Sequence, residues 1–316
     1  MLLDSASLYF RAFFGVPDDR TDPTAPPVNA VRGFLDFIAT LVRDHRPTAL
    51  IACWDNDWRP QFRVDAIPSY KTHRLADGAI TEEEVPDALA PQVLIIERAL
   101  AALGITRIGA DGYEADDVIG TLVARHKGQL PIDVVTGDRD LFQVVDDAAG
   151  VRVLYTARGG VRSPDLVDQA FLAEKYGIAS GEQYADMATL RGDASDGLPG
   201  VAGIGEKTAA KLITAYGSLA GLRAAIDGGD PAIKGAQRRN LEAGSAYLDV
   251  GPLVVRVAHP RMAKTVFQEN FSDLVLDGPG ALAGMIYSSS CPTNSPRNPF
   301  ASRDGVSRAT RSLADR

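Results

Sequence analysis

Acidic residues gather in two short clusters near the middle of this 316-residue chain. The first cluster holds Glu114, Asp116 and Asp117, directly before an apolar stretch with helical spacing. The second holds Asp138 and Asp140, just past an apolar run typical of a buried strand. In α/β proteins, ligands bind outside the carboxyl ends of the strands, and carboxylate oxygens suit Mg²⁺ and Mn²⁺. The two clusters therefore predict a divalent metal site.

Four further carboxylates fit the same pattern. Asp4 and Asp55 each end a short apolar run, whereas Asp193 and Asp196 lie in a glycine-rich stretch. Any one of them could instead be a helix N-cap or a turn residue. Nine carboxylates in one cleft would repel unless cations neutralised them, so we expect two or more Mg²⁺ or Mn²⁺ ions. Such pairs of ions activate a water and stabilise both oxygens of a phosphodiester under attack.

Other hydrolytic chemistries lack their characteristic residues. None of the four histidines lies near the acidic clusters in the sequence, which disfavours a histidine general base. No serine stands in a Gly-x-Ser-x-Gly context, and the glycine-rich stretch lacks the spacing of a Walker A loop. Metal-assisted phosphodiester hydrolysis remains the favoured chemistry.

A second motif, at about 192–215, has the form of a helix-hairpin-helix. The turn Gly203-Ile-Gly205 opens into a helical pattern in which Lys207 and Lys211 lie four residues apart on one face. Glycines let the backbone approach a phosphate, and a helix N-terminus attracts it. The alternative is a glycine-rich turn that caps an ordinary helix.

Basic and aromatic side chains interleave between residues 57 and 84. This segment could be a solvated surface loop, or a gate that stacks bases and neutralises the phosphates of a single strand. Composition alone leaves both interpretations open. The residues in question are Arg59, Phe62, Arg63, Tyr70, Lys71, His73 and Arg74.

The elements that must position these residues alternate between strand and helix in the first half of the chain. This alternation predicts an α/β fold with a mostly parallel central sheet flanked by helices and a site at the strand C-termini. Helices replace strands from residue 164 onward. The expected strands are 2–4, 49–54, 105–108, 132–135 and 151–155, and the expected helices are 29–43, 91–103, one from 114, 164–176, 181–191, 218–226 and 236–243.

Composition excludes several classes of protein. The net charge of −8 and pI near 5.1 argue against a chain that coats nucleic acid through bulk charge, although local basic groups can still contact phosphates. No apolar run is long enough to span a membrane. Cys53 and Cys291 match no metal spacing, so the expected location is the cytoplasm, in association with the nucleoid.

Taken together, these motifs resemble the prokaryotic 5′→3′ exonuclease and flap endonuclease family, in the form found at the N-terminus of bacterial DNA polymerase I. Six motifs occur in the family's order across roughly residues 1–285. They are Leu3-Asp4-Ser-Ala-Ser, Trp54-Asp55, Phe62-Arg63 with Pro68-Ser-Tyr70-Lys71 and Arg74, Tyr113-Glu114-Ala-Asp116-Asp117, Thr136-Gly-Asp138-Arg-Asp140, and Gly192-Asp193-Ala-Ser195-Asp196 through Gly205-Glu-Lys207-Thr208.

The resemblance implies a PIN-like nuclease core over residues 1–165, with a helical arch or clamp at about 57–90. A helical region over 166–287 would carry the hairpin motif, and residues 288–316 are expected to form a disordered tail. No polymerase sequence follows, so a free-standing nuclease is expected. Its substrates would be DNA with 5′ flaps, nicks, gaps or single-stranded 5′ ends, and RNA primers, in replication and repair, and the simplest assembly is a monomer.

The resemblance also assigns roles to individual residues. The nine carboxylates match the family's metal cluster. Arg63, Lys71 and Arg74 would contact phosphates, and Tyr70 would stack on a base near the cut. A monovalent ion such as K⁺ would bridge the hairpin and the Ser195 hydroxyl to a phosphate. The residues expected to bind DNA are Ser195, Gly203, Gly205, Lys207, Thr208 and Lys211.

Two rival functions stay open at this point. A non-catalytic DNA-binding protein would use the hairpin alone, but it has no reason to keep nine carboxylates beside phosphates. A PIN-type ribonuclease would use fewer carboxylates and would not need the hairpin.

Overall fold

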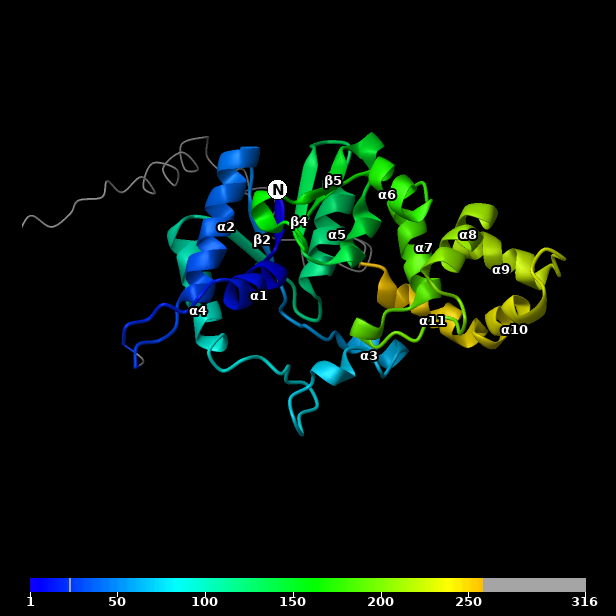
Figure 1. Ribbon diagram of the computed structural model, residues 1–316, viewed down its shortest axis with the longest axis horizontal. Helices are drawn as coiled ribbons and strands as arrows, with labels where there is room; N and C mark the ends of the chain where they lie inside the picture. The colour runs from blue at the N-terminus through cyan, green and yellow to red at the C-terminus, as the bar shows by residue number, and fades with distance from the viewer. Residues whose placement is uncertain (23, 258–316) are drawn as a thin grey trace, which may run out of the picture.

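The structure, a computed structural model, describes residues 1–22 and 24–257 (Figure 1). The last part of the expected helical region, from residue 258, and the expected disordered tail lie outside these residues. A six-stranded sheet in the order β3-β2-β1-β4-β5-β6 forms the centre of the chain. Its strands are β1 (Leu2–Asp4), β2 (Ile51–Trp54), β3 (Thr106–Gly109), β4 (Ile132–Thr136), β5 (Val151–Tyr155) and β6 (Asp165–Val167).

Five of these strands run parallel, and only β6 pairs antiparallel, with β5. The expected mostly parallel α/β sheet is therefore confirmed. The strand order reverses between β1 and β4, since β1 pairs with β2 on one side and with β4 on the other. In open parallel sheets this reversal opens a crevice at the carboxyl ends of the strands. Asp4 ends β1 at this crevice.

Helices cover both faces of the sheet. Side chains alternate along β1, so that Leu3 belongs to the core under α1 (Ser5–Gly15), α2 (Asn29–His45) and α4 (Ala90–Ala102). Leu2 points to the opposite core, under α5 (Ala115–His126). A strand buried on both faces needs a continuous apolar run, which explains the strand sequences.

The second half of the chain is helical and extends sideways from the sheet (Figure 1). α11 packs against α7 and also against α3, which belongs to the first half of the chain. The helical region thus touches the segment expected to form the arch. Its helices are α6 (Gln169–Tyr176), α7 (Gly181–Arg191), α8 (Glu206–Tyr216), α9 (Leu219–Asp227), α10 (Gly235–Ala243) and α11 (Ser245–Val255).

The expected helix over 164–176 is wrong in its first part. Residues Asp165–Val167 form the edge strand β6, and α6 begins only at Gln169. Asp168 separates the two elements because its carboxylate accepts a hydrogen bond from the Phe171 N–H, as an N-cap does. The expected domain boundary at residue 165 therefore falls inside the sheet.

The segment at about 57–90 holds short elements rather than a long helix. It contains α3 (Gln61–Ala66) and the 3₁₀ turn η1 (Thr72–Arg74). Arg59 connects the start of the segment to Tyr70, because its Nε donates to the Tyr70 carbonyl at 2.6 Å. Within the described residues, no helix is long and apolar enough to cross a membrane.

Candidate metal centre

A cavity of about 550 Å³ opens at the carboxyl edge of the sheet. Five of the nine predicted carboxylates line it, namely Asp4, Asp55, Glu114, Asp116 and Asp138. They come from the ends of β1, β2 and β4 and from the start of α5. Cations also line the cavity: Lys71, Arg74 and Arg139.

Asp4 is both a helix cap and a cavity residue. One of its oxygens accepts from the Ser7 N–H at 3.2 Å, and the other accepts from the Thr136 hydroxyl at 2.6 Å. Burial, together with the nearby charges of Asp55 and Asp138, raises the pKa of Asp4 to about 7. The N-cap interpretation and the metal-site interpretation of this residue are thus compatible.

Asp55 lies against the start of α5, and Asp116 belongs to the first turn of that helix. Asp55 accepts a hydrogen bond from the Ala115 N–H at 2.7 Å, at the end of the helix where the dipole favours negative charge. Burial nevertheless raises the pKa of Asp55 to about 6. Burial and the charges of Asp4 and Asp138 also raise the pKa of Asp116 well above its usual value. Too little positive charge lies near these carboxylates to keep their pKa values in the usual range.

Asp140, Asp193 and Asp196 adjoin the cavity without forming its wall. Burial and the charges of Asp138 and Asp196 raise the pKa of Asp140. Asp193 and Asp196 are paired instead, with Arg139 Nη2 at 2.9 Å and with Arg74 Nη2 at 2.8 Å.

Whether the site fits divalent ions depends on its donors. Among the described residues, no group of three His, Cys, Asp or Glu side chains is arranged to hold one ion directly. The donor chemistry does fit, because Asp140 Oδ1 is buried without a hydrogen-bond partner among the described residues, and the pKa values of Asp4 and Asp116 are raised. Mg²⁺ keeps several of its waters, so carboxylates at this spacing can hold it partly through water.

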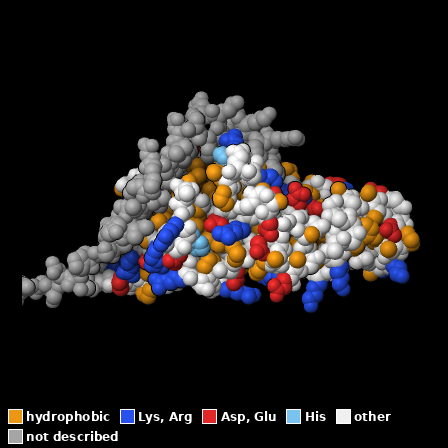
Figure 2. Space-filling model, turned by 90° about the horizontal axis from the view of Figure 1, so that it is seen from above, with side chains coloured by type: hydrophobic (Ala, Val, Ile, Leu, Met, Phe, Trp, Pro, Cys, Tyr) orange, Lys and Arg blue, Asp and Glu red, His pale blue; other side chains and the backbone are white. Residues whose placement is uncertain are grey.

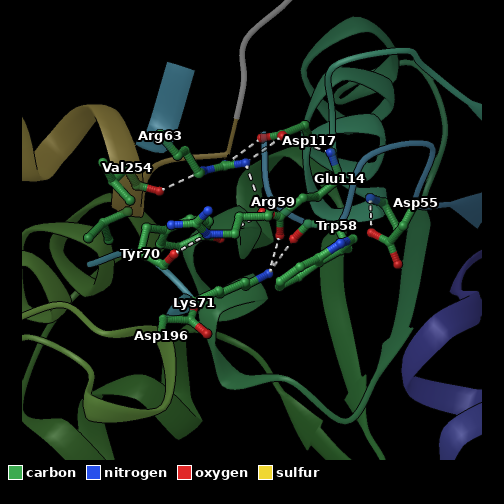
Figure 3. A network of polar contacts seen from close by, with 12 residues as sticks. Asp55, Trp58, Arg59, Arg63, Tyr70, Lys71, Glu114, Asp117, Asp196 and Val254 are labelled. Atoms are coloured by element: carbon green, nitrogen blue, oxygen red, sulfur yellow. Dashed lines mark hydrogen bonds and ion pairs between the residues drawn. The ribbon is translucent and has the colours of Figure 1, made fainter. Parts of the chain in front are cut away.

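Arg63 and Asp117 form a buried ion pair (Figure 3). Arg63 is 3% exposed, and its two Nη atoms donate to the Asp117 oxygens at 2.7 and 2.6 Å. Its Nε donates to the Val254 carbonyl at 3.0 Å. The two charges neutralise each other in this structure, and the roles of Arg63 as a phosphate contact and of Asp117 as a metal ligand stay predictions.

Tyr70 is buried, and its role as a base-stacking residue stays a prediction. The residue is 3% exposed and belongs to the hydrophobic core. Its hydroxyl donates to Glu114 Oε1 at 2.7 Å (Figure 3). In this conformation the ring has no face open to a base.

Lys71 and Arg74 line the cavity, and their contact with a phosphate stays a prediction. The Lys71 ammonium donates to Glu114 Oε2 at 2.6 Å and to the Trp58 carbonyl at 3.3 Å. Burial disfavours the ammonium, but Glu114, Tyr70 and Asp196 together outweigh this and raise the pKa of Lys71 well above its usual value. Glu114 is therefore neutralised by protein cations as it stands, and its role as a metal ligand stays a prediction.

The predicted hairpin has the expected form. Gly203 adopts a φ of +72°, which an L side chain rarely takes, and Gly205 directly precedes α8. A Cβ at Gly205 would meet no protein atom within 4 Å, so another molecule could approach the backbone there. Lys207 and Lys211 are exposed on α8, Thr208 is half-buried beside them, and Ser195 lines the cavity.

Three residues near the acidic group went unpredicted: Trp58, Arg139 and Arg191. Trp58 and Arg139 line the cavity, and Arg139 lies between two predicted ligands in the sequence, which was an available signal. Arg191 is the last residue of α7 and lies 3.6 Å from an oxygen of Asp193. Its position follows only from the packing of α7.

Comparison with protein-family models decides the affiliation. A model described as 5′-3′ exonuclease, N-terminal resolvase-like domain, matches residues 1–177, and one described as 5′-3′ exonuclease, C-terminal SAM fold, matches residues 179–269. The chain belongs to the 5′-3′ exonuclease family. As a member it is an enzyme of the nuclease class, and the resemblance found in the sequence is confirmed.

Individual relatives agree with this family. A 5′-3′ exonuclease of Streptomyces coelicolor is 61% identical over 261 residues, which are 82% of this chain and 85% of that protein. A DNA polymerase I of Mycobacterium bovis is 42% identical over 76% of this chain, but the match covers only 25% of the polymerase.

The fold is also shared with a solved structure. A bacteriophage T5 flap endonuclease, solved as a pseudo-enzyme-product complex with DNA and metal ions, superposes with a TM-score of 0.63 at 20% identity. The match covers 91% of this chain and 96% of that one. At this level of identity the likeness supports the fold.

Proposed function

We propose that this 5′-3′ exonuclease hydrolyses DNA phosphodiesters at free 5′ ends and at 5′ flaps, including those in nicked or gapped duplexes. The observation that carries the proposal is the cavity lined by Lys71 and Arg74 together with four carboxylates, Asp4, Asp55, Asp116 and Asp138, that form no ion pair with any described residue. The sequence-related exonuclease and the fold-related flap endonuclease support the same substrate class.

We propose Mg²⁺ or Mn²⁺ as the cofactor. The residues that would hold it are Asp4, Asp55, Asp116, Asp138 and Asp140, with Glu114, Asp193 and Asp196 close by. Two bound ions would supply an activated water and would neutralise the oxygens of the phosphodiester. The T5 endonuclease named above was solved with metal ions, which supports this choice.

The chain's own residues would hold and orient the DNA. Lys71 and Arg74 lie at the cavity wall, where their charges would offset those of the scissile phosphate. Ser195, Gly203, Gly205, Lys207, Thr208 and Lys211 would hold the duplex, with K⁺ as the proposed bridging ion at the hairpin.

The same proposal extends to organisation and role. The sheet would form the nuclease core, the segment at about 57–90 would admit the 5′ strand, and the helices after residue 168 would hold the duplex. The chain would act as a monomer on cytoplasmic, nucleoid-associated DNA, removing flaps or RNA primers during replication and repair.

The test is incubation of the purified protein with a 5′-labelled flap duplex, with Mg²⁺, with Mn²⁺ or with EDTA. We expect cleavage with either ion and none with EDTA. Asp138→Asn should abolish cleavage while DNA binding, measured in Ca²⁺, persists. Normal cleavage by Asp138→Asn would contradict the assigned site, and absence of metal-dependent cleavage by the wild type would leave the rival DNA-binding function.

A further inference from the structure

Arg191 occupies a position that the proposed chemistry does not use. It ends α7, and its side chain is only 10% exposed. Nη1 donates to Glu206 Oε2 at 3.2 Å, whereas Nη2 lies 3.6 Å from Asp193 Oδ2 and makes no hydrogen bond with any described residue. The Arg191 guanidinium therefore lies between the Asp193 carboxylate and Glu206, the first residue of α8.

Asp193 is held from more than one side. Arg139 Nη2 donates to its Oδ2 at 2.9 Å, and the Ser195 N–H donates to its Oδ1 at 2.8 Å. Arg139 is 41% exposed, but Arg191 is enclosed by protein. Arg139 supplies the hydrogen bond, and the enclosed Arg191 adds a charge whose position is restricted, because few alternative positions are open to a buried planar guanidinium.

Glu206 connects this support to the hairpin. It opens α8, which directly follows the Gly203–Gly205 turn and carries the exposed Lys207 and Lys211. α7 and α8 pack against each other, so the two ends of the Arg191 bridge lie on adjacent helices. A shift of α8 relative to α7 would change the distance that Arg191 has to span.

The loop after Arg191 also contacts the segment that holds Ser69 and Lys71. The Lys71 N–H donates to the Asp196 carbonyl at 2.9 Å, and the Ser69 hydroxyl donates to the Gly197 carbonyl at 2.8 Å. Gly197 has a φ of +70°, and a Cβ there would lie 2.1 Å from the Ser69 carbonyl oxygen. This loop is therefore fixed between Arg191 on one side and the Lys71 segment on the other.

We propose that Arg191 is a positioning residue that fixes Asp193 relative to α8, so that the hold on the duplex and the geometry of the metal centre are coupled. The inference rests on the proposed function, since it takes α8 as the duplex-holding helix and Asp193 as a ligand close to the ions. A lysine would not reproduce this arrangement, because its charge sits on one atom, whereas the planar fork of Arg191 turns different nitrogens toward Asp193 and Glu206.

The test uses Arg191→Lys, Arg191→Met and Glu206→Gln in the full chain. Mn²⁺ binding without DNA is measured by titration calorimetry, and cleavage is measured on a 5′ flap duplex. Loss of a group that orients a metal ligand costs roughly 10–100-fold in metal affinity or activity, so we expect both Arg191 variants to lose about tenfold in each. The loss of activity should appear in kcat more than in KM. Arg223→Met is the matched control, since it breaks an arginine–aspartate pair with Asp249 in the same helical region.

The direction of the change in Mn²⁺ affinity distinguishes a positioning role of Arg191 from a purely electrostatic one. If Arg191 contributed charge alone, Arg191→Met would bind Mn²⁺ more tightly and Arg191→Lys would match the wild type, and either result overturns the proposal. Glu206→Gln should lower kcat in the wild type and add nothing in the Arg191→Met background, because the two residues act as one bridge. Additive losses would overturn the proposal. A wild type that binds Mn²⁺ without cleaving DNA would contradict the proposed function alone.

Discussion

The cations of residues 57–90 separate into two groups by their access to the cavity. Arg63 is buried away from it and is bonded to Asp117 and a carbonyl, whereas Lys71, although also buried, and Arg74 line the cavity. A buried cation away from the cavity acts on stability through its partner, but a cation at the cavity wall can also face a substrate. Residues that looked alike in the sequence therefore have different expected effects.

Substitution of Arg63 should destabilise the fold. Arg63→Met leaves the buried Asp117 carboxylate uncompensated, which costs about 3–5 kcal/mol in comparable pairs. Urea unfolding monitored by circular dichroism measures the loss. Arg63→Met combined with Asp117→Leu removes both charges and should recover much of the stability. Unchanged stability with lost cleavage would instead restore the phosphate-contact role of Arg63.

Substitution of Lys71 should mainly slow cleavage. Lys71→Ala removes a cation from the cavity wall, and loss of one electrostatic donor at a reacting group costs about 10²-fold or more in kcat. The fold should persist because Tyr70 and Arg63 still contact Glu114, at 2.7 and 3.5 Å. Single-turnover cleavage of a flap duplex, with a thermal melt as control, measures the effect. Wild-type cleavage by Lys71→Ala would remove this residue from the site.

Among the helices and strands, α8 is the element most clearly expected to bind DNA. Its exposed face presents Lys207 and Lys211 beside a turn whose backbone is open to approach. Elsewhere, Lys and Arg side chains alternate with carboxylates over the visible face of the molecule (Figure 2). Affinity for DNA should therefore depend on this local pair rather than on general surface charge.

Replacing Lys207 or Lys211 by Ala should weaken binding of any duplex sequence. Each lost phosphate contact is expected to lower the slope of log affinity against log salt by about 1. Fluorescence anisotropy with a labelled flap duplex in Ca²⁺, over a range of KCl, measures both quantities. Lys127→Ala is a suitable control because Lys127 follows the far end of α5. An unchanged slope would exclude a phosphate contact.

Elements with strong local signals were predicted well. The strand at 151–155 and the helix at 181–191 match β5 and α7 to the residue. The helix expected at 164–176 was partly wrong because the three residues of β6 are held by pairing with β5, which a local pattern does not contain. The helix α11 was not predicted; it carries Pro252 inside it, which argues against a helix locally.

For the whole molecule, the buried carboxylates couple stability to pH and to metal. The pKa values of Asp4 and Asp55 are about 7 and about 6, above the usual value of 3.8. The folded state therefore holds these protons more tightly than the unfolded chain, so the contribution of these two groups to folding stability is fully present below about pH 4 and is lost as the pH rises through 6 and 7. Bound cations should reverse this loss.

In EDTA, we expect the contribution of these carboxylates to Tm to fall between pH 5 and pH 8. Adding Mg²⁺ should raise Tm, and this rise should be larger at pH 8 than at pH 5. Differential scanning fluorimetry measures both. Asp4→Asn should flatten the pH dependence and reduce the Mg²⁺ effect. An Mg²⁺ effect of equal size at pH 5 and pH 8 would argue against ion binding by these carboxylates.

The sequence by itself determined the fold class, the family and most of the acidic group. Apolar runs that end in carboxylates are a local signal, and parallel strands carry such residues to one edge of the sheet. The structure places five of the nine carboxylates on one cavity and three beside it.

Only the tertiary structure decided which charges are paired. Asp117 and Arg63 stand 54 positions apart, and only the fold brings them together as a pair. Tyr70 and Glu114, 44 positions apart, are similarly joined by a buried hydrogen bond. The role of Arg191 depends on the packing of α7 against α8. A sequence shows which charged residues are present. Which of them pair in the interior depends on how the chain folds around them, because burial of an unpaired charge is costly.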